Sequence, residues 1–352
     1  MTRRVLAAAG AAAAIAALTP GVAGAATRTV FAGGDGVVRN APAQFSPNAF
    51  LRRTITVHKG DTVRWQFRGF HTVTVPPKGD NPPPFAQATA DKVSGALDAA
   101  GHPFWFNGVL PTLVVNPRAA APTKGTAYTG SSFRNSGLPA LPNAKPYSLR
   151  FTKTGTFTYF CAVHPGMVGR VRVVSSQTRV PTNAQNRAAG ARELNRLAAQ
   201  ARVTAARPPR SPTIVDLGRA PHDRRFTINA FFPSAITARV GQVIEFSMAG
   251  QNPNEIHTVT FGSAQTRAQV PFVTQTGAIN PIAAYRSEPP DAPLIITGTN
   301  HGNGFLNAGV LDANRATPTT RNAVRVAFSK PGSYHVLCLI HEGMEATVTV
   351  TP

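Results

Sequence analysis

The pattern Cys-x-x-His-x-Gly-Met occurs twice in this chain of 352 residues. One copy begins at Cys161 and the other at Cys338, and each lies between two runs rich in valine, threonine and aromatic residues. Such runs are typical of β-strands, so each copy predicts a short loop that joins two strands. A thiol, an imidazole and a thioether on one loop are ligands that soft metal ions bind, which makes each loop a candidate metal site.

The similarity between the two halves extends beyond these loops. Residues 257–260 repeat residues 71–74 as His-Thr-Val-Thr, and matching positions around the two loops keep one constant offset. An internal repeat of this kind indicates a duplicated structural unit. The sequence therefore predicts two similar domains in tandem, over residues 26–176 and 226–352.

The composition favours domains built from strands. Hydrophobic residues make up 42% of the chain and charged residues 14%, with 30 Gly and 31 Pro, which is enough apolar material for sizeable cores joined by many turns. Short alternating runs such as 62–67 predict half-buried strands, and the expected class is all-β. Two insertions, about 76–146 and 262–321, are too long for simple loops, so we expect them to hold structure of their own. Residues 102–110 resemble 301–311, which predicts the same insert in both domains.

The first 25 residues have the features of a cleaved export signal. Arg3 and Arg4 form a basic start, an apolar stretch follows, and small residues end at Ala25. The apolar stretch is too short to span a bilayer, and no other stretch approaches that length. We therefore expect cleavage near Ala25, export to the periplasm or the extracellular space, and no integral membrane segment in the mature chain.

The chain is strongly basic, with a formal net charge of +21. Such a charge favours acidic partners and anionic surfaces and bears on association rather than on the fold. No nucleic-acid-binding motif accompanies the charge, so a nucleic acid is not the expected partner.

Residues 177–225 differ from the two repeats and predict a basic linker between domains. The stretch 183–206 has helical composition but few large apolar residues, namely Leu194, Leu197 and Val203. We therefore expect a solvated helix without a partner, which the prolines after it would end.

The chain has two cysteines, and in an exported protein a Cys161–Cys338 disulfide is one interpretation of them. The two cysteines occupy equivalent positions in the repeats, however, so a disulfide would have to join matching sites of separate domains. Metal binding by each thiol is the interpretation we prefer.

Each repeat resembles a cupredoxin of the plastocyanin and azurin type, and the loop Cys161-x-x-His164-Pro165-x-Met167 is especially similar to that of amicyanins. The resemblance covers the strands around each site, but not the insertions or the linker. It implies two Greek-key β-sandwiches, each with one type 1 (blue) copper that cycles between Cu(I) and Cu(II). The copper ligands that it implies are His71, Cys161, His164 and Met167 in the first domain, and His257, Cys338, His341 and Met344 in the second.

The donor set suits copper on chemical grounds as well. Cu(I) prefers thiolate and thioether ligands and Cu(II) prefers imidazole, so a mixed set with a weak Met suits neither state completely. Zinc is the less suitable ion, because Met is a poor zinc ligand. The same resemblance implies that electrons leave through the exposed edge of the loop histidine, so His164 and His341 are the expected exits.

Three positions depart from the family pattern or differ between the repeats. Thr72 and Thr258 stand where cupredoxins often carry an Asn that locks the Cys loop, so this support must be built in another way. Glu342 in the second loop replaces Pro165 of the first. We expect the two centres to differ in potential, with Glu342 lowering that of the second by stabilising Cu(II).

Three functions are compatible with these features. The first is an exported electron carrier that exchanges electrons with an acidic redox partner protein. The second is a copper oxidoreductase, similar to nitrite reductases or two-domain laccases, that uses the inserts as a substrate site. No His-x-His pair occurs, and Phe160 and Leu337 precede the cysteines, so the ligands of further copper centres are not found. The third, copper storage or delivery, would favour more than the four Met present.

Two further histidines, His102 and His301, recur in the inserts. They could cap the copper sites, bind another metal, or simply pack or form hydrogen bonds. We expect packing or hydrogen bonding.

Overall fold

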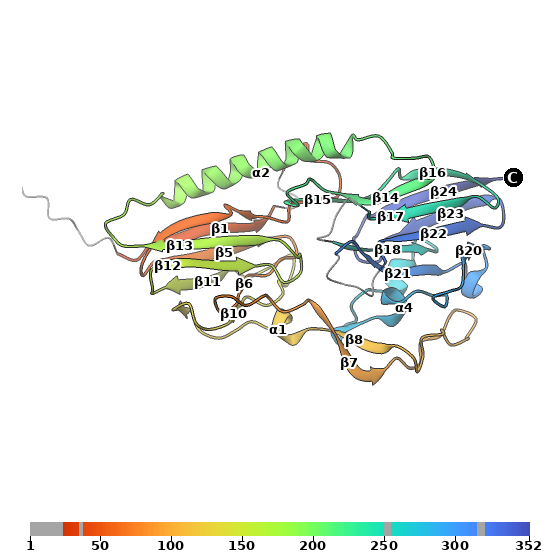
Figure 1. Ribbon diagram of the computed structural model, residues 1–352, viewed down its shortest axis with the longest axis horizontal. Coiled ribbons are helices and arrows are strands. Elements are labelled where there is room, and N and C mark those ends of the chain that lie inside the picture. The colour runs from red at the N-terminus through yellow and green to blue at the C-terminus, as the bar shows by residue number, and fades with distance from the viewer. Residues whose placement is uncertain (1–23, 35–37, 250–254, 315–320) are drawn as a thin grey trace, which may run out of the picture.

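The computed structural model describes residues 24–34, 38–249, 255–314 and 321–352. The leader expected over residues 1–25 lies almost wholly outside the described residues. Figure 1 shows two β-sandwiches, one from each half of the chain, with one long helix, α2, running along one side of the molecule. The expectation of an all-β fold is confirmed.

The first sandwich consists of two five-stranded sheets that lie face to face. In spatial order, one sheet contains β3 (Phe50–Leu51), β1 (Thr27–Gly33), β5 (Thr62–Arg68), β11 (Tyr147–Phe151) and β9 (Ala127–Tyr128). The other contains β10 (Arg134–Asn135), β6 (Thr74–Val75), β12 (Gly155–Phe160), β13 (Val168–Val174) and β4 (Thr54–His58).

The second sandwich repeats this arrangement with one extra strand. One sheet contains β2 (Phe45–Ser46), β15 (Thr227–Phe232), β14 (Ile214–Arg219), β17 (Val243–Ser247), β22 (Ala323–Phe328) and β20 (Leu294–Ile296). The other contains β16 (Ala235–Arg239), β24 (Glu345–Thr351), β23 (Gly332–Leu337), β18 (Ile256–Phe261) and β21 (Leu306–Asp312).

The duplication seen in the sequence recurs in the strand pairing. β1 runs parallel to β5 as β14 runs parallel to β17, and β4 runs parallel to β13 as β16 runs parallel to β24. β14 lies within the stretch 177–225 that was expected to be linker. The second sandwich therefore begins earlier in the chain than its sequence repeat suggests.

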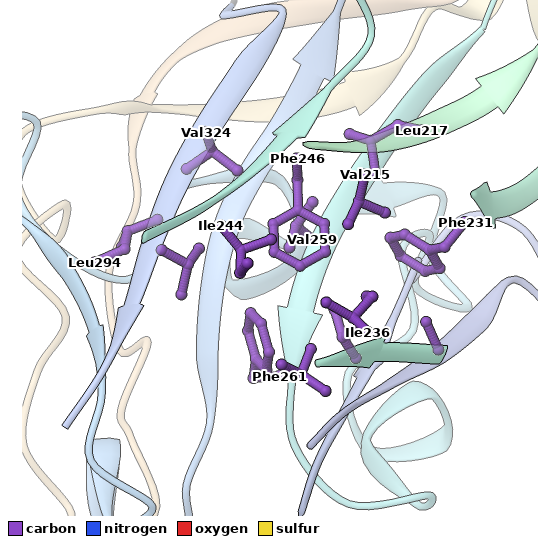
Figure 2. Packing of buried hydrophobic residues seen from close by; sticks show 14 of the residues in the cluster. Val215, Leu217, Phe231, Ile236, Ile244, Phe246, Val259, Phe261, Leu294 and Val324 are labelled. Atoms are coloured by element: carbon purple, nitrogen blue, oxygen red, sulfur yellow. The ribbon is translucent and has the colours of Figure 1, made fainter. Parts of the chain in front are cut away.

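Alternating residues of the strands form the two cores. In the second sandwich Ile244 and Phe246 point inward from one sheet and meet Val259 and Phe261 from the other, as Figure 2 shows. Burying a side chain of this size stabilises the fold by about 1.5–3 kcal/mol. These apolar interiors hold the strand ends from which the metal loops project.

Helix α2 (Asn183–Ala205) contacts strands of both sandwiches, which corrects the expectation of a solvated helix. Its buried face combines Leu194 and Leu197 with the small residues Ala198 and Ala201. A Cβ at Gly190 would lie 3.2 Å from a backbone oxygen, so the helix approaches the first sandwich closely. Counting only large apolar residues missed this stripe, because alanine completes the i, i+3, i+4, i+7 spacing.

Both ends of α2 are fastened by side chains. Thr182 and Gln185 form a capping box at its start, and the Asn183 side chain accepts a 2.9 Å hydrogen bond from the Thr29 backbone of β1. At its end the buried Arg219 of β14 donates to the carbonyl of Ala205 at 2.9 Å. Within the described part of the chain, no helix is both long and apolar enough to cross a membrane.

The insertions hold structure of their own, as expected. β7 (Ala86–Lys92) and β8 (Pro111–Val115) of the first insertion form a small sheet with β19 (Ala278–Ile279) of the second. β2, from the first half of the chain, pairs with β15 of the second sandwich. The remaining helices are α1 (Pro117–Ala120), α3 (Thr266–Gln269), α4 (Pro281–Ala284) and the 3₁₀ turn η1 (Asn300–Gly302).

Candidate metal centres

The first Cys loop places three potential ligands around one point. Cys161 follows β12, His164 lies on the loop before β13, and His71 lies just before β6. The two Nδ1 atoms are 3.0 Å apart, and the Cys161 Sγ lies 3.5 Å from His164 Nδ1 and 4.0 Å from His71 Nδ1. All three side chains are buried, so their donor atoms face one another away from water.

The second loop repeats this geometry. The Nδ1 atoms of His257 and His341 are 3.1 Å apart, and the Cys338 Sγ lies 3.9 and 3.6 Å from them, respectively. Among the described residues, these two triads are the groups of His, Cys, Asp or Glu found close enough to hold a metal ion. Six of the eight ligands implied by the resemblance therefore lie where a metal could bind.

Backbone hydrogen bonds close each loop upon itself. Cys161 N–H donates to Met167 O at 3.0 Å, and Met167 N–H donates to His164 O at 3.1 Å. The second loop has the same pair of bonds, at 3.0 and 3.2 Å. Gly166 and the matching Gly343 have φ of 89° and 74°, which favours glycine at the turn between His and Met.

The two methionines are buried in the cores of their own sandwiches. Met167 is 2% exposed and Met344 is 0% exposed. Their backbones are fixed beside the histidines by the loop hydrogen bonds. A role for either thioether as an axial ligand stays a prediction.

Both thiols are free and buried, so the alternative of a Cys161–Cys338 disulfide is wrong for this structure. Burial alone would raise the pKa of the Cys161 thiol, but contacts with His164 and His71 outweigh it and hold the pKa well below its usual value. The same balance lowers the pKa of Cys338. The thiolate is the form that binds metal, so each triad is prepared for a cation.

The donor set fits copper. In the first centre two imidazole nitrogens and one cysteine sulfur lie within 4.0 Å of each other, and all three side chains are buried. This mixed soft and imidazole set is the one that copper accepts in both of its oxidation states. Copper would be held by His71, Cys161 and His164 in one centre, and by His257, Cys338 and His341 in the other.

Threonine supplies the loop support that the sequence left unexplained. Thr72 N–H donates to the Cys161 Sγ at 3.3 Å, and the Thr72 Oγ1 accepts from Ala162 N–H at 2.8 Å. Thr258 makes the matching contacts with Cys338 and Leu339, at 3.4 and 2.8 Å. One residue thus fixes both the sulfur and the backbone that follows it.

A buried asparagine from each insertion extends this support. Thr72 Oγ1 contacts Thr74 Oγ1, which donates to Asn135 Oδ1 at 2.9 Å. The Asn135 Nδ2 in turn donates to three carbonyls at the end of α1. In the second centre Thr260 and Asn307 make the same connection to α4.

Sequence reasoning missed Asn135 and Asn307, although a signal was present. The motif Asn-Pro-x-Ala-Ala occurs at both 116–120 and 280–284, where it forms α1 and α4. Asn135 and Asn307 donate to the carbonyls at the ends of these two helices. The expected match of 102–110 with 301–311 is wrong, because β21 takes the position in its sheet that β10 takes in the first. The short motif Asn-Pro-x-Ala-Ala therefore marks the part that the two inserts share, whereas the longer match of 102–110 with 301–311 does not.

The histidines that precede the loops pack against glycine. A Cβ at Gly33 would lie 2.5 Å from His71 Nε2, and one at Gly218 would lie 3.0 Å from His257 Nε2. Both Nε2 atoms are buried without a hydrogen-bond partner among the described residues. These rings are therefore positioned by close packing rather than by a polar contact.

The loop histidines, in contrast, share one carboxylate. Glu255 Oε1 lies 3.5 Å from His164 Nε2, and its Oε2 lies 3.4 Å from His341 Nε2. The two histidine side chains are only 9% and 16% exposed. The expectation that their edges form routes to an external partner is therefore wrong, because those edges face each other across Glu255.

The shared carboxylate governs the charge of both rings in the metal-free protein. Burial alone would lower the pKa of His164, but Glu255 and Cys161 raise it to about 9. Burial likewise opposes a charged His341, yet contacts with Cys338 and Glu255 raise its pKa to about 10. Burial would raise the pKa of Glu255, and the two histidines hold it far below its usual value instead.

Charged residues beside the second Cys loop have no counterpart beside the first, because Glu342 and Glu345 stand where the first loop has Pro165 and Val168. Glu342 is exposed beside His341, as its polar character suggests. Arg267 of α3 donates to the backbone carbonyls of Cys338 and His341, at 3.1 and 3.3 Å. Arg267 also pairs with Glu345 at 2.8 Å. Its charge acts against that of Glu342, because a nearby cation favours the less positive oxidation state of a bound metal, and the pair with Glu345 reduces this effect.

His301 forms a contact between the two inserts, whereas the side-chain contact of His102 stays within the first insert. His301 lies between Asp98, at 3.2 Å, and Glu288, at 3.0 Å, and His102 lies 3.9 Å from Asp98. None of these contacts involves a residue of either Cys loop. The expectation of packing or hydrogen bonding is confirmed for His301. The His102 side chain is instead 78% exposed and lies beyond hydrogen-bond distance of Asp98.

Comparison with known proteins gives solved structures only, because no protein family profile and no curated protein matches this chain. A variant of amicyanin in its reduced Cu(I) form is 18% identical, with 42% of this chain and 82% of that chain covered and a TM-score of 0.22. The plastocyanin of Dryopteris crassirhizoma is 19% identical over 39% of this chain and 99% of its own, with a TM-score of 0.21. Auracyanin B is 21% identical over 40% of this chain and 87% of its own, with a TM-score of 0.25.

Proposed function

We propose that this chain, with its two cupredoxin-like sandwiches, is an electron-transfer protein that binds one type 1 copper in each half. The observation that carries the proposal is the repeated triad, in which two Nδ1 atoms and one Sγ converge within 4.0 Å in each sandwich. A buried methionine follows on each loop. This is the ligand set of blue-copper electron-transfer sites.

When bound, copper would supply the one-electron couple between Cu(I) and Cu(II). The protein contributes a rigid frame, because each ligand is fixed by backbone or side-chain contacts that do not depend on the metal. Thr72 and Thr258 hold the sulfurs, and the glycines at 33 and 218 hold the rings of His71 and His257. A frame of this kind keeps the same ligand geometry in both oxidation states, which lowers the reorganisation that electron transfer requires.

We further propose that the chain is exported and that its redox partner is an acidic protein. The leader over residues 1–25 supports export, and a net charge of +21 supports the character of the partner. Binding of such a partner would weaken steeply as the salt concentration rises, since exposed charges are screened.

The enzyme alternative has less support. Among the described residues, no metal-binding group of His, Cys, Asp or Glu beyond the two triads was found. Copper reductases and oxidases need a further centre at which the substrate reacts. Turnover separates the two functions, because an enzyme would consume nitrite or oxygen repeatedly, whereas a carrier would only exchange electrons with its partner.

The first experiment is a copper count and a visible spectrum of protein loaded with Cu(II). We expect two coppers per chain and an intense thiolate-to-copper band that falls by half in Cys161→Ser and in Cys338→Ser. His71→Ala should lose the first centre, whereas His222→Ala, at an exposed position, should retain both. A wild-type protein that binds no copper, or binds it without the intense band, contradicts the proposal.

A further inference from the structure

Glu255 is the residue that joins the two halves of the molecule at their metal centres. Its two oxygens contact His164 Nε2 at 3.5 Å and His341 Nε2 at 3.4 Å, and its side chain is only 5% exposed. In each ring the opposite nitrogen, Nδ1, faces the cysteine of its own triad. The two candidate centres are therefore connected by two ligand rings and one carboxylate.

The carboxylate is held in place by both halves of the chain. Asn48 Nδ2 donates to Glu255 Oε1 at 2.7 Å, and Thr227 Oγ1 donates to the same oxygen at 3.3 Å. Both donors are buried, and both lie next to the pair of β2 with β15 that joins the first half to the second sandwich. Burying an ionised carboxylate is costly, and these two donors together with the two histidines offset that cost.

The arrangement is not a by-product of the duplication. Glu255 stands two residues before His257, and Gly69 stands two residues before His71 in the first repeat. Only one of the two matching positions carries an acid, yet that acid serves both loop histidines. A metal-bound histidine usually gives its other ring N–H to an outer partner of its own, whereas here the two rings share one partner.

Resting on the proposed function, we propose that the two coppers exchange electrons directly through the bridge of His164, Glu255 and His341. One electron leaves the copper of the half that is reduced first, Cu(I) becoming Cu(II), and reduces the copper of the other half from Cu(II) to Cu(I). No proton and no further reactant is needed. Glu255 is a positioning residue that keeps the two rings in contact with one group.

This inference also explains why the edges of both loop histidines are covered. An external partner cannot reach His164 or His341 as it would reach an exposed ring edge, because each is packed against Glu255. The rings instead serve transfer inside the molecule. External electrons would enter at one sandwich by another route and then spread over both coppers.

The test follows the redistribution of one electron after a flash of a flavin photoreductant, with less than one equivalent of electrons per chain. Every protein carries Met344→Gln, which replaces the thioether of the second loop with an amide and is expected to make the two centres distinct in potential and spectrum. Cys161→Ser and Cys338→Ser give the reference spectrum of each centre. We expect a phase whose rate does not depend on protein concentration and which both Cys variants lack.

Glu255→Gln should slow this phase by about tenfold or more, because an amide NH₂ then faces one imidazole N–H and separates the two groups. Asp91→Asn makes the same kind of change at an exposed position of β7, away from both Cys loops, so the rate should stay close to that of the parent. If Glu255→Gln fails to fold, Asn48→Ala tests the same point, because it keeps the carboxylate but removes the hydrogen bond that positions it. This variant should also slow the phase. The thermal midpoint and the copper content are recorded for each variant, since a residue that only stabilises the fold would change these without changing the rate.

Three results overturn the inference. The first is two bound coppers with no concentration-independent phase, which leaves the proposed function standing. The second is an unchanged rate in Glu255→Gln with both coppers retained. The third is a third metal ion per chain that is lost in Glu255→Gln, which would make the bridge a metal site. Failure of the proposed function is separate, because it would show as the absence of the blue centres themselves.

Discussion

The Thr72→Val substitution tests whether threonine holds the first Cys loop. Valine keeps nearly the same shape but removes the Oγ1 that accepts from Ala162 N–H at 2.8 Å. The N–H of the buried Ala162 would then lack a partner, and an unsatisfied buried donor costs about 1–3 kcal/mol. The Thr72 N–H would still reach Cys161, so the loss is confined to the hydroxyl.

The expected loss of copper affinity follows from the same contact. Removing a group that orients a metal ligand typically weakens binding by about 10- to 100-fold. A 10- to 100-fold change corresponds to about 1.4–2.7 kcal/mol, which agrees with the cost of the orphaned N–H. The first figure applies to the free energy of unfolding and the second to copper binding, so the assay measures both quantities.

The assay uses Cys338→Ser as background, so that only the first centre can bind copper. Competition with a Cu(I) chelator gives the affinity, and urea unfolding of the metal-free protein gives the stability. Thr54→Val, the same chemical change at an exposed strand position, is the control and should alter neither. An unchanged affinity together with an unchanged free energy of unfolding in Thr72→Val would refute the role of the hydroxyl.

Three further predictions concern packing, charge and pH. Gly33→Ala should displace the ring of His71 and abolish the intense visible band of the first centre only, since the added Cβ would meet Nε2 at 2.5 Å; two intact bands would contradict this. Arg267→Gln should lower the potential of the second centre by about 40 mV in a redox titration, for roughly 1 kcal/mol at a partly exposed site. An equal or higher potential would show that Arg267 does not favour Cu(I). The metal-free protein should be most stable between about pH 6.5 and 9. In that range the folded pair carries one proton, on His341, and the unfolded pair also carries one, on the Cys338 thiol, so stability does not change with pH. As the pH rises above 9 the thermal midpoint should decrease, because the pKa of His341, raised to about 10, is approached. As the pH drops below 6.5 the midpoint should also decrease, because the Cys338 thiol, whose pKa is lowered in the folded protein, regains a proton. A midpoint that increases between pH 9 and 10 would contradict this prediction.

The repeat made the triads predictable from sequence. Four potential ligands, His, Cys, His and Met, recurred in the same order in both repeats. The surrounding strands alternated clearly, so the positions of Cys161 and Cys338 at strand ends followed from local patterns. The support of the loops was less accessible, because Thr72 reaches Asn135 through contacts between residues far apart in the chain. The recurring Asn-Pro-x-Ala-Ala motif was the one local sequence signal for this support.

The contacts between the halves could not be predicted from the sequence. Glu255 breaks the repeat instead of following it, so comparing the two copies gives no signal for it. Helix α2 binds through alanine and glycine, whose burial depends on how closely two backbones approach rather than on hydrophobicity. β14 and β2 likewise take their places through pairing with distant strands, which local propensity does not determine.

The pairing of β2 with β15 has a consequence for how this protein can be divided. A cut in the stretch between β13 and α2 would leave β2 on the fragment that lacks its partner strand. The other fragment would expose the edge of β15, and unpaired strand edges promote aggregation. The second sandwich is therefore completed by a strand from the first half of the chain, so a boundary placed between the two repeats would divide one sheet.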